Sequence, residues 1–204
     1  MNPLIQHKAL AIFLKNNVSG QVKTRLAKEV GHERAMQVYD RLCKHTLSVA
    51  AKVNASVIGF YTNEIETHPV FNEVRLQQGS GLGERMKNSF EFLLKRHEQV
   101  VLIGSDLPDL SAHLIQKAFE LLEKNDLVLG PALDGGYYLI ALRTPQPQLF
   151  EDITYSNARV LERTLAIAKA SHLSVGLLEP LRDLDTFEDL KHFDYLIDSD
   201  QKTP

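Results

Sequence analysis

The sequence is poor in the residues that build disulfide or zinc frameworks. Cys43 is the only cysteine among 204 residues, which excludes an internal disulfide and a cysteine-based zinc cluster. The eight histidines show no H-x-x-x-H or H-E-x-x-H spacing, so the sequence gives no support for a histidine-based zinc hydrolase. A single cysteine also suits a reducing compartment, and we therefore expect a cytoplasmic protein.

An excess of positive charge and long hydrophobic runs are missing as well. The formal net charge is −3 and the pI is near 6.2, so a basic surface that binds nucleic acid is not expected. The apolar stretch at residues 9–14 is too short for a signal peptide or a membrane span. With 44% hydrophobic residues and no internal repeat or linker, residues 1–204 are predicted to form one domain. A homodimer is compatible with this sequence.

Short runs rich in Val, Ile, Leu and Phe alternate with helical patterns along the chain. The runs are apolar throughout, which is typical of strands that helices cover on both faces. The predicted strands are residues 8–14, 56–61, 73–77, 99–103, 126–129, 137–142 and 173–178. Helices are predicted at 34–52, around 86–94, at 113–124, at 158–170 and after residue 186. This order predicts an α/β fold with a mostly parallel central sheet.

Three of these helices have a recognisable N-terminal cap. Ser111 and Asn157 each precede a helical pattern, and both residue types favour the N-cap position. Thr186 is followed three residues later by Asp189, which predicts a capping box at the start of the last helix.

Ligands of open parallel sheets gather where the carboxyl ends of strands lead into loops. The loop after the first predicted strand contains Gly20, Lys23 and Arg25 just before a helix. Two cations and free backbone amides suit a phosphate chain, although an ordinary solvated helix start explains them too. The spacing excludes the G-x-x-x-x-G-K-[ST] motif of P-loop enzymes.

Two further loops carry candidate ligand-binding residues. Gly79, Gly81 and Gly83 follow the third predicted strand and would allow a flat base or ribose to approach the backbone, but a plain glycine-rich turn is the alternative. Ser105 and Asp106 follow a buried strand, where a carboxylate can hold Mg²⁺ together with water and substrate phosphates. The alternative is that Asp106 only caps its own turn.

The remaining candidates lie near the C-terminal half of the predicted sheet. The turn Asp134-Gly135-Gly136 would offer unshielded amides to an acceptor, or it is a plain hairpin turn. Asp183 and Asp185 could bring a second carboxylate to the metal of Asp106, or Asp185 could assist the helix cap.

Taken in order, five motifs make a specific pattern. K-T-R-L, Q-x-G-x-G-L-G-E-R-M, I-G-S-D-x-P-x-L, P-A-x-D-G-G-Y-Y-L-I and D-L-D-T-x-E-D-L together resemble the bacterial glycosyltransferase-like family, also called radical-SAM/selenodomain-associated transferase 1. The resemblance covers about residues 8–190. It implies kinship with the 2-phospho-lactate guanylyltransferases and the molybdenum-cofactor nucleotidyltransferases. It also implies their Rossmann-like GT-A fold, that of nucleotide-diphospho-sugar transferases.

The resemblance implies a role for each loop. Lys23 and Arg25 would hold the nucleotide phosphates, and Asp106 would bind Mg²⁺ or Mn²⁺ with Asp183 or Asp185. The other residues implied in nucleotide binding are Lys15, Gly20, Gln78, Gly79, Gly81, Leu82, Gly83 and Ser105. Gly135, Gly136 and Tyr137 would contact the acceptor, and Asp134 could take a proton from it. The guanylyltransferases commonly have Thr and Asn after the Gly-Gly pair, where this chain has Tyr137 and Tyr138, so we expect a different acceptor.

The predicted function is therefore Mg²⁺-dependent transfer from a nucleotide-sugar or NTP to a small acceptor. The family label favours sugar transfer, whereas the K-T-R-L loop favours nucleotidyl transfer to a phosphorylated molecule. Both reactions would use the catalytic set Lys23, Arg25, Asp106 and Asp134. Lys23, Arg25 and the Mg²⁺ held by Asp106 would neutralise charge on the phosphate oxygens, and Asp134 could accept a proton from a hydroxyl acceptor. A non-catalytic nucleotide-binding module is the alternative from another class, and the intact carboxylates argue against it.

Overall fold

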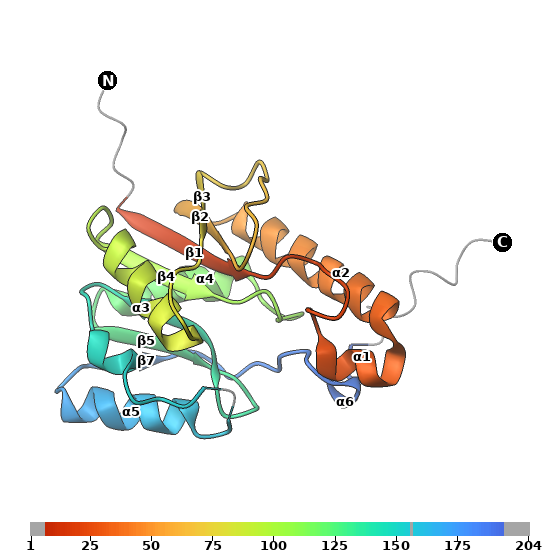
Figure 1. The fold of residues 1–204 in the computed structure, drawn as a ribbon. Helices are drawn as coiled ribbons and strands as arrows, with labels where there is room; N and C mark the ends of the chain where they lie inside the picture. The colour runs from red at the N-terminus through yellow and green to blue at the C-terminus, as the bar shows by residue number, and fades with distance from the viewer. Residues whose placement is uncertain (1–6, 156, 194–204) are drawn as a thin grey trace.

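A single seven-stranded sheet forms the centre of the molecule (Figure 1). The structure is a computed structural model and describes residues 7–155 and 157–193. The sheet has the order β3-β2-β1-β4-β6-β5-β7. Its strands are β1 (Lys8–Leu14), β2 (Ser56–Tyr61), β3 (Glu73–Leu76), β4 (Gln99–Ile103), β5 (Leu127–Pro131), β6 (Tyr137–Leu142) and β7 (Val175–Leu177). Only β6 runs antiparallel to its neighbours, so the predicted mostly parallel sheet is confirmed.

Helices cover both faces of this sheet, as the all-apolar strands predicted. The helical elements are α1 (Thr24–Val30), α2 (His32–Ala50), α3 (Leu82–Leu93), α4 (Ala112–Leu122), the 3₁₀ helix η1 (Pro147–Phe150), α5 (Val160–Ala170) and α6 (Phe187–Leu190). One core cluster joins α2 and α4 to the sheet, and the other joins α3, η1 and α5 to the opposite face. Within β1, Leu10 and Ile12 belong to the first cluster and Ala11 and Phe13 to the second. A continuous apolar run is the pattern that such two-sided burial requires.

A third, smaller cluster packs α1 and α2 against α6 from the other end of the chain (Figure 1). Leu26 of α1 and Leu184, just before α6, are both fully buried in it. The capping box of Thr186 and Asp189 is present, which confirms that prediction and fixes where α6 begins. The segment before α6 is thereby held beside the loop that precedes α1.

The strand register brings several loops to one edge of the sheet. Leu14 lies beside Tyr61, and Ile12 beside Ile103, so the loops after β1, β2 and β4 leave together. Because β6 is antiparallel, the turn from β5 into β6 reaches the same edge. The loops that the sequence marked as ligand-binding therefore share one region of the molecule.

Several element boundaries differ from the sequence prediction. Asn157 is not the N-cap of α5; Arg159 is, and the Asn157 side chain instead accepts a hydrogen bond from the Arg159 amide at 2.8 Å. The predicted cap at Ser111 is confirmed by a hydrogen bond from the Leu114 amide. Strand β7 is only three residues long, because it pairs with β5 alone at the edge of the sheet. Among the described residues, no helix is long and apolar enough to cross a membrane.

Candidate functional site

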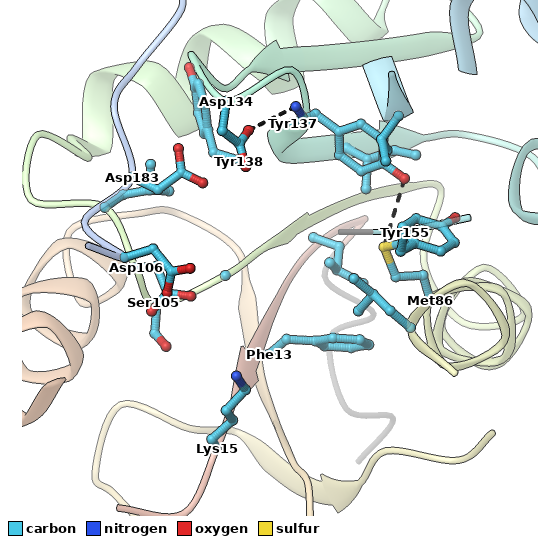
Figure 2. Close-up of a pocket in the computed structure, with 18 of the residues that line it drawn as sticks. Phe13, Lys15, Met86, Ser105, Asp106, Asp134, Tyr137, Tyr138, Tyr155 and Asp183 are labelled. Carbon is cyan, nitrogen blue, oxygen red and sulfur yellow. Dashed lines mark hydrogen bonds between the residues drawn. The ribbon is translucent and has the colours of Figure 1, made fainter. Parts of the chain in front are cut away.

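A cavity of about 620 Å³ opens at the edge of the sheet where these loops meet. Figure 2 shows its two ends: Asp106, Asp134 and Asp183 gather at one, and Met86 and Tyr155 lie at the other. We call the first the carboxylate end. The volume of the whole cavity lies in the range of pockets that bind nucleotides and other small molecules.

Lys23 and Asp106 form the central ion pair beneath the carboxylate end. The Lys23 side chain is 2% exposed, its Nζ pairs with Asp106 Oδ1, and it donates to the Leu184 carbonyl at 2.5 Å. The Leu184 amide in turn donates to the Asp106 carbonyl at 2.9 Å. Lys23 thus joins the loop after β1 to the loop after β4 and to the segment before α6.

The backbone of Lys23 explains how a lysine at a helix start becomes buried. It is the N-cap of α1 and has φ 47°, in the left-handed region that non-glycine residues rarely adopt. Its side chain is directed inward, and Lys23 is not among the described residues that line the cavity. The sequence predicted contact with phosphates, whereas the structure shows the ammonium group engaged with Asp106.

Four other cations, Lys15, Arg25, Arg85 and Arg182, do line the cavity, and two of them belong to the loop after β1 and the start of α1. Arg25 is 61% exposed, and its Nη1 lies 3.3 Å from Asp185 Oδ2. Lys15 is exposed at the end of β1 and lines the cavity as well. Because neither cation is buried, both can reach an anion without a large desolvation cost. The structure therefore brings Arg25 and Asp106 to the same cavity, as the sequence motifs required.

The carboxylates repel one another at this end of the cavity. Burial, followed by the nearby charge of Asp134 and then of Asp106, raises the pKa of Asp183 to about 6. Within residues 7–155 and 157–193, no three His, Cys, Asp or Glu side chains form a ready-made metal site. Mg²⁺ needs only one or two protein carboxylates when substrate phosphates and water supply the other ligands. Asp106 and Asp183 fit that requirement, because a cation between them would relieve the repulsion.

Tyr39 of α2 fixes the two loops that carry these groups. Its hydroxyl accepts from the Lys15 amide at 2.8 Å and donates to the Lys15 carbonyl at 3.0 Å. The buried Ser105 hydroxyl donates to it at 3.3 Å. Ser105 and Tyr39 both line the cavity. The sequence analysis missed Tyr39, because its place in a helical pattern looks like an ordinary core position.

Cys43 lies one helical turn after Tyr39, and its environment is that of an inert thiol. Burial raises the pKa of Cys43 to about 11. The thiol is therefore protonated at neutral pH and does not provide a nucleophile.

The glycine-rich loop before α3 is shaped mainly by packing. A Cβ on Gly83 would lie 2.5 Å from the Tyr155 ring, and one on Gly79 2.9 Å from the Arg85 amide. Leu82 lines the cavity, but Gln78 and the three glycines are not among its described lining residues. Gln77 and Arg85, which the sequence analysis did not single out, do line it. The predicted contact of this loop with a base stays a prediction.

The amides of the Asp134-Gly135-Gly136 turn are used within the turn. Gly135 donates to the Ala132 carbonyl at 3.1 Å, and Gly136 to Asp134 Oδ1 at 2.8 Å. Gly135 has φ 91°, and a Cβ there would overlap the carbonyl of Ala158. Gly136, Asp134 and Tyr137 line the cavity. An acceptor would therefore meet the Asp134 carboxylate and the Tyr137 ring rather than free amides.

The other end of the cavity is formed by apolar and aromatic side chains. They come from the ends of three neighbouring strands, from α3 and from the segment before α5. We call this set the apolar wall: Phe13, Met86, Leu102, Tyr137, Ile140 and Tyr155. Within it, the Tyr137 hydroxyl contacts the Met86 sulfur at 4.0 Å, shown as a dashed line in Figure 2, and it also interacts with the side chains of Tyr155 and Thr164.

Comparison with known proteins supports the fold. The model of the family described as "Uncharacterized protein conserved in bacteria (DUF2064)" matches residues 35–157. A Desulfovibrio desulfuricans G20 protein described as a "putative nucleotide-diphospho-sugar transferase" is 31% identical, with a TM-score of 0.86 over 96% of this chain and 90% of that chain. No curated protein matches the chain.

More distant solved structures share the fold alone. CMP:2-keto-3-deoxy-manno-octonic acid synthetase complexed with CTP is 10% identical, with a TM-score of 0.57 over 93% of this chain and 98% of that chain. Rv0371C from Mycobacterium tuberculosis H37Rv, in complex with manganese, is 14% identical, with a TM-score of 0.54 over 95% and 99%. The nucleotide-diphospho-sugar transferase fold implied by the five motifs is thereby confirmed.

Proposed function

The chain belongs to the bacterial protein family DUF2064, and from this premise we propose that it is a metal-dependent transferase that uses a nucleotide donor. The donor is a nucleotide-sugar or a nucleoside triphosphate, and the acceptor is a small molecule. One observation carries the proposal: Lys15 and Arg25 line the same cavity as Asp106 and Asp183. A polyphosphate chelating a divalent ion has the charge pattern that such a pair of surfaces binds.

The carboxylate end supplies the residues that would hold the metal. Asp106 and Asp183, with Asp185 beside Arg25, are the oxygen ligands at hand. When bound, Mg²⁺ or Mn²⁺ supplies positive charge to the donor phosphates as a Lewis acid. The manganese complex and the CTP complex of the two distant structures are consistent with this use of the fold.

The side chains around the cavity would then have separate roles in the transfer. Arg25, with its planar fork, and Lys15 would bind phosphate oxygens and stabilise the negative charge that develops on the leaving group. Lys23 holds Asp106 in place from below and is thus a positioning residue. If the acceptor reacts through a hydroxyl, Asp134 is the carboxylate to take its proton, because the Gly136 amide already orients it.

The released product distinguishes nucleotidyl transfer from sugar transfer. Purified protein is incubated with Mg²⁺, a panel of NTPs and nucleotide-sugars, and pooled small-molecule acceptors. Pyrophosphate release identifies nucleotidyl transfer, and nucleoside diphosphate release identifies sugar transfer. Asp106→Ala should abolish either, whereas Asp109→Ala, an exposed carboxylate three residues away in the same loop, should not. Tight nucleotide binding without product from any acceptor would contradict a transferase and favour a binding module.

A further inference from the structure

The apolar wall is poorly suited to polar ligands. Its side chains carry only two polar hydrogen-bonding groups, the hydroxyls of Tyr137 and Tyr155. The Tyr155 hydroxyl is buried and makes no hydrogen bond of standard geometry to a described residue. The Tyr137 hydroxyl is already engaged with the Met86 thioether and with the side chains of Tyr155 and Thr164. A polar group bound here would give up hydrogen bonds to water and find few replacements.

This environment disfavours a nucleobase at the apolar wall. Each base carries several donors and acceptors along its edges, and these would stay unpaired against Phe13, Met86 and Ile140. The polar side chains of Gln77 and Arg85 lie outside the wall, in the loop before α3 and in its first turn. Both already bond backbone carbonyls, and Arg85 Nη1 donates to Gln77 Oε1 at 3.5 Å. An alkyl or aryl group has no hydrogen bonds to lose, so it fits the apolar wall better than a base.

Gly104 lines the cavity at a point where open space faces its backbone. It follows Ile103, which pairs with Ile12 of β1 and Leu139 of β6, so it lies in the middle of the sheet edge. Its φ is not in the left-handed region, and a Cβ there would meet no atom within 4 Å. Neither the backbone nor the packing requires glycine here. A methyl group would instead occupy cavity space next to Asp106.

Two leucines extend the apolar surface of the cavity toward solvent. Leu82 at the start of α3 is 45% exposed, and Leu133 in the turn between β5 and β6 is 56% exposed. Both line the cavity. Because Leu133 precedes Asp134, the apolar surface adjoins the carboxylate assigned to the acceptor.

We propose that the apolar wall binds an alkyl or aryl segment of the acceptor, whose reacting oxygen lies at the carboxylate end. The acceptor is thus an amphiphilic small molecule with a hydroxyl or phosphate at one end and an apolar segment at the other. This inference rests on the proposed transferase function and adds the chemical class of the second substrate. It also accounts for Tyr137 after the Gly-Gly pair, because this residue is part of the apolar wall.

Straight-chain 1-alkanols from ethanol to 1-octanol are suitable probes, with binding followed by ligand-observed NMR. Affinity should rise about fourfold for each added methylene until the apolar wall is filled. Leu133→Ser and Leu82→Ser should each weaken 1-hexanol binding at least about threefold. Leu177→Ser is the matched control, because Leu177 is 51% exposed on β7 and is not among the described lining residues. Gly104→Ala, which adds one methyl group to this space, should weaken alkanol binding without lowering the melting temperature.

Nucleotide binding, measured first and without alkanol, separates this inference from the proposed function. Intact Mg-nucleotide binding with no dependence on alkanol chain length would overturn the inference alone. Competition between nucleotide and 1-hexanol would also overturn it, since the apolar wall would then belong to the nucleobase. Equal loss of binding in Leu177→Ser would show adsorption to any exposed leucine and would overturn it too. We expect the nucleotide and the alkanol to bind at the same time. Leu133→Ser should weaken the binding of the alkanol and leave the binding of the nucleotide unchanged.

Discussion

The two ends of the cavity are built in different ways. The carboxylate end consists of loops, and ion pairs such as Lys23 with Asp106 and Arg25 with Asp185 hold it together. The apolar wall consists mainly of strand ends and helix side chains, and close packing holds it together. Substitutions at the carboxylate end should therefore change activity and stability by adding or removing charge. Substitutions in the apolar wall should do so by changing side-chain volume or by leaving a buried polar group without a hydrogen bond. The difference separates the part that performs the transfer from the part that selects a substrate.

The largest effect is expected for Asp106→Asn, which keeps the shape of the carboxylate end and removes one charge. Turnover should fall by about 10³-fold or more, because the variant loses a carboxylate that would hold the divalent ion against the reacting phosphate. Steady-state kinetics of the reaction identified by product release would measure it. Asp109→Asn is the control, and a similar fall in that variant would mean that the loop as a whole, rather than Asp106, matters.

The stability of the folded protein should depend on the ion pair between Lys23 and Asp106 at the carboxylate end. Asp106→Ala leaves the buried Lys23 ammonium with the Leu184 carbonyl and the more distant Asp185 carboxylate at 4.0 Å. It should lower the free energy of unfolding by about 1–3 kcal/mol, less than for a fully buried pair because Asp106 is half exposed. The double variant Lys23→Met/Asp106→Ala should recover part of that loss in urea denaturation. If the double variant loses the sum of the two single losses, Lys23 and Asp106 are not coupled.

Replacing Asp183 should stabilise the protein, whereas replacing Asp106 should destabilise it. The reason is that burial and neighbouring carboxylates disfavour the charged form of Asp183. Its pKa of about 6 lies above the usual value for an aspartate, so the contribution of Asp183 to stability is most favourable below about pH 4 and is lost as the pH rises through 6. Asp183→Asn should thus be more stable than the parent by about 1–2 kcal/mol at pH 7.5 and equal to it at pH 4. Urea denaturation at both pH values measures this, and a variant less stable at pH 7.5 would contradict it.

The smallest effects are expected at two tyrosines that line the cavity, Tyr155 in the apolar wall and Tyr138 outside it. The same chemical change should have opposite effects on stability at these two positions. Tyr155→Phe removes a hydroxyl that makes no hydrogen bond of standard geometry to a described residue, and should leave stability unchanged or raise it by up to about 1 kcal/mol. Tyr138→Phe removes a hydrogen bond of 3.1 Å to the Glu179 carbonyl, and should cost about 0.5–1.5 kcal/mol. A larger loss in Tyr155→Phe than in Tyr138→Phe would show that the apolar wall holds a polar partner.

The elements of the sheet were predictable to different degrees. The bounds of β1, β2, β4 and β6 agree with the prediction at both ends, because each is an apolar run that polar or turn residues bound clearly. The predicted β7 was twice its observed length, since an edge strand pairs on one side only and its apolar flanks look the same in sequence. The direction of β6 was not predictable, because an apolar run reads alike in either orientation.

The carboxylate end could be predicted in composition but not in contacts. Motif order indicated that Arg25, Asp106 and Asp183 meet, since loops after parallel strands share an edge. It could not show that Lys23 turns inward, because that depends on the carbonyl of Leu184, far along the chain. The apolar wall was missed apart from Tyr137. Phe13 and Ile140 sit in strand patterns where a cavity-lining residue and a core residue look the same.

Isothermal titration of a nucleotide with and without Mg²⁺ is the most direct test of the carboxylate end. We expect at least one NTP or nucleotide-sugar to bind with a micromolar Kd that requires the metal, and Arg25→Ala to weaken it about tenfold or more. If no nucleotide binds at millimolar concentration, or if binding is unchanged by EDTA and by Arg25→Ala, the cations and carboxylates of this cavity do not form a metal–polyphosphate site.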